Sequence, residues 1–151
     1  MMAAAVTSLS AADSCRYITA ETLRQRLNDG PPLLLVDLSP EVLFARKHIP
    51  GSIPTGAYPL QTPAQLARLD AVLPRLEAAT EDIVLICPRG GQTALRAVQY
   101  IQSKGVDPAR LLILKNGILG WPYAAVQSAT SGTLQQHLRY LNARPQLPNH
   151  I

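Results

Sequence analysis

The chain has 151 residues, of which 47% are hydrophobic and 16% are charged, and its formal net charge is +4. These values fit one ordinary globular domain with a proper core. No apolar run is long enough to span a membrane. The basic excess lies in residues 108–151, where four scattered basic residues are too dispersed for a nucleic-acid-binding surface.

The first segment, residues 1–16, is rich in Ala and Ser and has no basic residue before Arg16. This composition argues against a secretory signal and against an Arg-rich transit peptide. We therefore expect a flexible N-terminal tail. The two cysteines, Cys15 and Cys87, do not form a disulfide framework, so a reducing, cytoplasmic location is the simplest expectation.

Short apolar runs then alternate with segments of helical spacing over residues 17–126. Strands are expected at 17–19, 33–36, 83–86 and 111–114, with a brief strand near Pro54. Helices are expected at 20–28, 41–47, 93–104 and 118–126, and another begins at Thr62 with a capping box and carries Leu66, Leu69, Leu73 and Leu76 along one face. This order predicts an α/β domain with a mostly parallel sheet.

The C-terminal segment, residues 127–151, has leucines at helical spacing within 133–142, followed by prolines. We expect a helical extension packed on the domain. A helix that binds a partner or a second copy is the alternative.

Cys87 is the most informative residue, because it ends an apolar strand and precedes Gly90 and Gly91, after which a helix begins. Ligands of parallel α/β sheets bind beyond the carboxyl ends of the strands. Asp37, Cys87 and Lys115 each follow a strong strand, so they could line one crevice. Backbone N–H groups and the helix dipole would stabilise a thiolate there. The alternative is an inert, buried structural cysteine.

Three segments, taken in order, resemble the rhodanese family: LLLVDLSPEVLFARKHIPGSIP, LICPRGGQTALRA and LLILKNGILGWPYA. The resemblance implies a rhodanese-like three-layer domain over 17–126, with helices on both faces of the sheet. It also implies a sulfurtransferase in which Cys87 carries sulfane sulfur as a persulfide. The donor would be thiosulfate, polysulfide or another persulfide, and the acceptor cyanide or a thiol, which a protein could supply. The residues implied in substrate binding are Arg89, Gly90, Gly91, Gln92 and Thr93.

The chain departs from the family pattern at several positions. Catalytic rhodanese loops often carry Arg where this chain has Pro88 and Gln92, so Arg89 is the only cation in the loop. We therefore expect weak thiosulfate:cyanide activity and a better fit to persulfide or polysulfide transfer. Asp37 and His48 are expected to be structural residues near the site, and Trp121 a core residue.

Other functions fit the sequence less well. Dual-specificity phosphatases of this fold need an Arg six residues after the Cys, where this chain has Thr93. A non-catalytic rhodanese-like binding module remains the main alternative. The scattered histidines predict no metal site, and no phosphate-loop or dinucleotide motif predicts a cofactor. No nucleic-acid or membrane partner is expected.

Overall fold

The structure, a computed structural model, describes residues 16–127, in which the chain forms a five-stranded sheet of order β1-β5-β4-β2-β3. All neighbouring strands pair in parallel. The predicted α/β fold is therefore confirmed. The strands are continuous apolar runs because a parallel sheet is covered on both faces, so successive side chains are buried on either side. The strands are β1 (Arg16–Ile18), β2 (Leu33–Asp37), β3 (Ile53–Pro54), β4 (Asp82–Ile86) and β5 (Leu111–Leu114).

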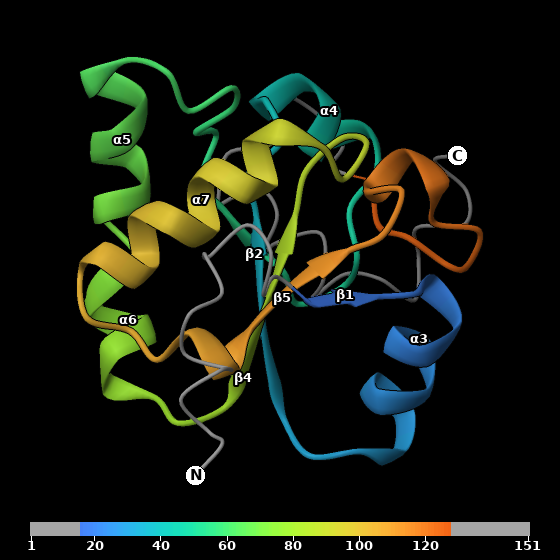
Figure 1. Cartoon of the computed structure of the whole chain (residues 1–151). Coiled ribbons are helices and arrows are strands. Elements are labelled where there is room, and N and C mark those ends of the chain that lie inside the picture. The colour runs from blue at the N-terminus through green and yellow to red at the C-terminus, as the bar shows by residue number, and fades with distance from the viewer. Residues whose placement is uncertain (1–15, 128–151) are drawn as a thin grey trace, which may run out of the picture.

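Helices cover both faces of the sheet, with α5, α6 and α7 on one side and α3 on the other (Figure 1). The helices are α3 (Ala20–Asp29), α4 (Glu41–Arg46), α5 (Pro63–Asp70), α6 (Leu73–Ala78) and α7 (Gln92–Ser103), with 3-10 turns η1 (Pro108–Arg110) and η2 (Ile118–Gly120). None of those in residues 16–127 is long and apolar enough to cross a membrane. Residues 1–15 of the predicted tail and the predicted C-terminal helix at 133–142 fall outside the described residues, whereas Arg16, the last residue of the predicted tail, begins β1.

The core consists of two clusters, one on each face, and β4 supplies both. Ile83 and Leu85 belong to the cluster under α7, whereas Val84 and Ile86 belong to the cluster that contains residues of α3. This alternation follows from the two-residue period of a strand. Cys87 continues the series of Ile83 and Leu85, so its side chain joins the cluster under α7.

The helix expected from Thr62 onward begins as predicted and then breaks. The Thr62 side chain accepts from the Gln65 backbone, and the Gln65 side chain accepts from the Thr62 backbone, which completes the capping box. The chain nevertheless forms two helices, α5 and α6, rather than one. Pro74 lies at the start of α6 and cannot donate an intrahelical hydrogen bond, which explains the break.

The helix expected at 118–126 is wrong, because only the single turn η2 forms. Pro122 disfavours helical geometry at the residue before it. Trp121 is accordingly extended, with φ −77° and ψ 113°. The chain then runs to Val126, whose backbone pairs with that of His48.

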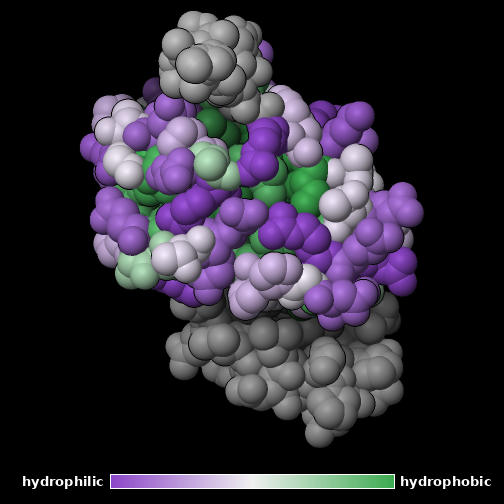
Figure 2. Space-filling view, turned by 60° about the horizontal axis from the view of Figure 1, so that its bottom comes forward, coloured by the Kyte–Doolittle hydropathy of each residue, from purple (hydrophilic) through white to green (hydrophobic). Residues whose placement is uncertain are grey.

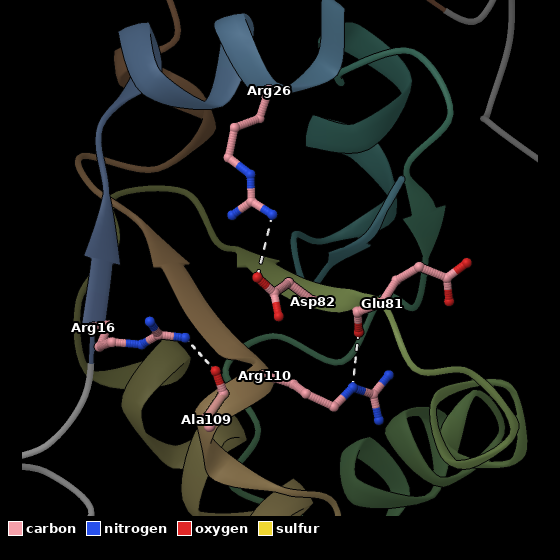
Figure 3. A network of polar contacts seen from close by, with 6 residues as sticks. All are labelled: Arg16, Arg26, Glu81, Asp82, Ala109 and Arg110. Carbon is pink, nitrogen blue, oxygen red and sulfur yellow. Dashed lines mark hydrogen bonds and ion pairs between the residues drawn. The ribbon is translucent and has the colours of Figure 1, made fainter. Parts of the chain in front are cut away.

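Polar contacts join the elements at the amino-terminal end of the sheet, opposite Cys87. Arg26 of α3 forms an ion pair with Asp82 at the start of β4, with 3.2 Å between nitrogen and oxygen (Figure 3). Arg110 donates to the Glu81 and Leu76 carbonyls over 2.8 and 3.0 Å. Figure 2, which turns this end forward, shows mainly hydrophilic side chains with smaller apolar areas between them. Arg26 and Arg110 thus join neighbouring elements of the fold at this end of the sheet.

Candidate active site

The Cys87 thiol lies where β4 ends and the loop to α7 begins. Its side chain is only 2% exposed and belongs to the hydrophobic cluster under α7. The Gly90 backbone N–H nevertheless donates to Cys87 Sγ over 3.1 Å. The sulfur is therefore buried among apolar side chains and accepts a hydrogen bond from one backbone N–H.

The loop brings further backbone donors to this end of α7. The N–H groups of Arg89, Gly91, Gln92 and Thr93 have no hydrogen-bond acceptor within residues 16–127. Gly91 is the N-cap of α7, which is 12 residues long, so the positive end of the helix dipole points into the loop. Open N–H groups at a helix start bind anions. The substrate-binding residues expected from the sequence therefore lie together beside Cys87.

Backbone hydrogen bonds join the turn around η2 to the start of the Cys87 loop. The Ile118 and Leu119 N–H groups donate to the Cys87 and Pro88 carbonyls over 2.9 and 3.0 Å. In a trans peptide the carbonyl and the following N–H point in opposite directions. The Arg89 N–H consequently points away from η2.

Two glycines permit this close packing of backbone on backbone. Gly117 has φ +65°, and a Cβ there would overlap the Cys87 and Pro88 carbonyl oxygens. Gly90 has φ +73°, and a Cβ there would lie 2.8 Å from the Leu114 carbonyl oxygen. Both positions require a residue that lacks a side chain and tolerates positive φ.

Charged side chains at the carboxyl-terminal edge are unequally placed. Arg89 and Lys115 are exposed, as expected for residues that line an opening. Of the three residues expected to line one crevice, Asp37 and Cys87 are both buried and Lys115 alone is exposed. The carboxyl ends of β2 and β4 do lie side by side, because Asp37 pairs with Ile86. The charge that a ligand would meet at the opening is therefore positive.

Asp37 fixes the start of the loop after β2. One carboxylate oxygen, Oδ1, accepts the Ser39 N–H over 2.8 Å, while Oδ2 is buried and has no partner within the described residues. Burial raises the pKa of Asp37 from 3.8 to about 6, and hydrogen bonding from Ser39 opposes part of this rise. No ion pair of the described residues includes Asp37.

His48 and Trp121 both contact segments other than the Cys87 loop. His48 is fully buried, its Nδ1 lies 2.6 Å from the Phe44 carbonyl oxygen, and its ring stacks on the Phe44 ring at 3.7 Å. Trp121 is buried in the cluster on the opposite face from Cys87, and its Nε1 donates to the Ala124 carbonyl. Neither contact brings a proton-transfer group to the thiol.

The sequence interpretation missed a cation beside the site, Arg96. Its Nη2 donates to the Pro59 carbonyl over 2.7 Å and reaches Thr93 Oγ1 at 3.3 Å. Pro59 is far away in the sequence, so no local pattern reveals this contact. The available signal was the spacing of four residues from Gln92, which places both side chains on one face of α7.

Two other features lie apart from Cys87. No group of three His, Cys, Asp or Glu in the described part of the chain could hold a metal ion. An open groove of about 370 Å³ lies between α4 and α5, and none of the Cys87 loop lines it. Its lining residues are Pro40, Glu41, Val42, Gly56, Tyr58, Thr62, Ala64, Gln65 and Arg68.

Gly117→Ala should disrupt the packing under the Cys87 loop. We expect the free energy of unfolding to fall by about 3 kcal/mol or more, since strain at positive φ adds to a backbone overlap. Gly51→Ala is the matched control, because Gly51 has φ +86° but open space around its Cβ position. It should lose about 1 kcal/mol. Urea unfolding measures both, and equal losses would contradict the overlap.

Asp37→Asn should change how stability depends on pH. The pKa of Asp37 is about 6 in the folded chain and lower in the unfolded chain, so its contribution is greatest below about pH 4 and is lost as pH rises through 6. Two pKa units correspond to about 3 kcal/mol. The variant should therefore gain up to that amount relative to wild type between about pH 4 and 8.

The control is Asp29→Asn, because Asp29 is exposed at the end of α3. Its difference from wild type should stay nearly constant over the same pH range in urea unfolding. A flat difference for Asp37→Asn would show that the buried carboxyl does not titrate in this range.

Comparison with known proteins agrees with the parallel α/β fold and with the Cys87 loop that follows β4. The model of the rhodanese-like domain family matches residues 19–124. A sulfurtransferase of Allochromatium vinosum is 31% identical over 105 residues, which are 69% of this chain and 85% of that protein.

Solved structures share the fold at lower identity. A thiosulfate sulfurtransferase from Pseudomonas aeruginosa superposes with a TM-score of 0.59 and 23% identity, covering 79% of this chain but only 23% of that one. A Saccharomyces cerevisiae homologue of single-domain rhodanese and of the Cdc25 phosphatase catalytic domain gives 0.57 and 20%, covering 74% and 82%. The strand order, the loop after β4 and these matches lead to one conclusion: the chain belongs to the rhodanese-like domain family.

Proposed function

We propose that the protein is a sulfurtransferase that carries sulfane sulfur as a persulfide on Cys87. The observation that carries this proposal is the Gly90 N–H aimed at Sγ, next to the open N–H groups of Arg89, Gly91, Gln92 and Thr93. Such donors stabilise both a thiolate and the anionic outer sulfur of a persulfide. The 31% identical sulfurtransferase supports the same reaction class.

The reaction proceeds in two displacement steps. The Cys87 thiolate attacks the outer sulfur of the donor, and the S–S bond of the donor breaks with its electron pair on the leaving group. Thiosulfate releases sulfite, and a persulfide releases its thiolate. A nucleophile such as cyanide or a thiolate then attacks the outer sulfur and returns Cys87 as a thiolate. No external oxidant or reductant is consumed.

Burial of the thiol fits this cycle. Sγ is covered by the loop, but a persulfide extends the side chain by an S–S bond of about 2 Å. The outer sulfur is therefore the atom that the acceptor reaches, while the Cys87 sulfur stays packed. This geometry favours transfer of the outer sulfur over formation of a disulfide between Cys87 and the acceptor.

The loop composition indicates the preferred donor. Pro88 has no N–H, Gln92 has no charge, and Arg89 is the only cation between Cys87 and α7. Such a loop holds a doubly charged thiosulfate weakly. Persulfides and polysulfides, which carry less charge at the transferred end, are the better donors.

Replacing the thiol tests the proposal directly. After incubation with thiosulfate, polysulfide or an organic persulfide, intact mass spectrometry should show one added sulfur atom on the wild-type chain. Cys87→Ser should abolish the adduct and Cys15→Ser should keep it. Absence of the adduct with every donor would favour a non-catalytic binding module.

Adding a cation to the loop tests the donor preference. Gln92→Arg should raise kcat/KM for thiosulfate about tenfold, which corresponds to roughly 1.4 kcal/mol for a new charge-assisted contact. Gln99→Arg is the control, because Gln99 is exposed further along α7. Equal gains from both variants would indicate long-range attraction instead of a contact in the loop.

A further inference from the structure

Arg96 joins α7 to the segment that follows β3. Its Nη2 contacts the Pro59 carbonyl at 2.7 Å and Thr93 Oγ1 at 3.3 Å, and Thr93 Oγ1 in turn donates to the Pro59 carbonyl at 3.4 Å. The three groups therefore meet at one point, next to the first turn of α7. Thr93 is also the last residue of the loop whose N–H is open.

The segment that Arg96 contacts packs into the same core cluster as Cys87. Ala57 and Leu60 flank the Tyr58–Pro59 pair, and both belong to the same buried cluster as Cys87. The Leu60 N–H donates to the Ala57 carbonyl over 2.7 Å, which closes this turn. Arg96 thus links this segment to α7, the helix that follows the Cys87 loop.

The Arg96 guanidinium is not neutralised by any carboxylate within residues 16–127. The ion pairs found there are those of Arg26 with Asp82 and of Arg68 with Glu41. Arg96 Nε is moreover buried and donates to no acceptor in the described part of the chain. A buried charged donor without an acceptor is costly, and an anion would remove that cost.

The direction of the side chain brings this charge toward the site. Long side chains on a helix point back toward its N-terminus, and the contact with Thr93, one turn earlier, agrees with that rule. The positive charge of Arg96 therefore lies at the end of the row of open N–H groups. Arg89 provides a second cation from the exposed loop.

We propose that Arg96 is a specificity-determining residue for donors whose outer sulfur is attached to a sulfonate, and that it sets how much thiosulfate, the weaker donor, the site accepts. It supplies from α7 the charge that Pro88 and Gln92 do not supply from the loop. The sulfonate oxygens of a donor such as thiosulfate accept hydrogen bonds from the Arg96 guanidinium. The guanidinium either keeps its hydrogen bond to the Pro59 carbonyl at the same time or gives that bond up to the sulfonate. When the donor S–S bond breaks, the same charge stabilises the departing sulfite. This inference rests on the proposed persulfide transfer at Cys87.

Steady-state kinetics with two donors test the role of Arg96. With thiosulfate, Arg96→Gln should raise KM about tenfold or more, with a smaller change in kcat. With an organic persulfide that has an uncharged tail, KM should stay within about twofold of wild type. Arg96→Lys should recover part of the thiosulfate affinity, because it keeps the charge without the planar fork. Arg75→Gln, on the exposed face of α6, should change neither KM.

Equal KM increases for both donors in Arg96→Gln would overturn the proposal and leave Arg96 a structural residue. Thermal unfolding of each variant identifies a folding defect, and if Arg96→Gln does not fold, the same comparison of donors is made with Arg96→Lys. Failure of wild-type Cys87 to take up sulfur from either donor would refute the proposed function itself. Sulfur uptake by wild type together with an unchanged thiosulfate KM in Arg96→Gln would refute only the role of Arg96.

Discussion

The close approach of two backbone segments, 87–90 and 114–119, is the constraint on which the candidate site depends. β4 and β5 are neighbours in the sheet, so the segments that leave them emerge side by side. Gly90 and Gly117, both at positive φ, remove the side chains that would keep these segments apart. The η2 turn then binds the Cys87 and Pro88 carbonyls, which leaves the N–H groups of the loop free for a ligand.

The two ends of the sheet are built differently. At the amino-terminal end, Arg26 and Arg110 are bonded to groups around the start of β4. At the carboxyl-terminal end, the N–H groups of Arg89, Gly91, Gln92 and Thr93 lack acceptors within residues 16–127, and no cation of those residues pairs with the buried Asp37 carboxyl. Buried side-chain atoms without a partner occur at both ends, Arg110 Nη2 at the amino-terminal end and Asp37 Oδ2 at the carboxyl-terminal end, so the ends differ mainly in their backbone N–H groups.

Local patterns in the sequence predicted most of the fold. The apolar runs gave β2, β4 and β5, Thr62 and Gln65 gave a helix start, and the position of Cys87 after a strand followed from the same patterns. The sequence interpretation missed the helix break at Pro74 and the shortness of η2 before Pro122. To predict them, these two prolines would have had to count for more than the helical spacing of apolar residues. The Arg96–Pro59 contact and the fit of Gly117 under the loop join residues far apart in the chain, so only the folded structure reveals them.

The near-complete covering of Cys87 also filters what the chain can react with. A cysteine that is 2% exposed presents almost no surface to a reagent, and this disfavours bulky reagents more than slender ones. A disulfide on another protein would have to bring its S–S bond into line with this buried sulfur, which its own bulk opposes. The same burial that packs Cys87 into the core therefore also disfavours cross-linking of its sulfur to other proteins.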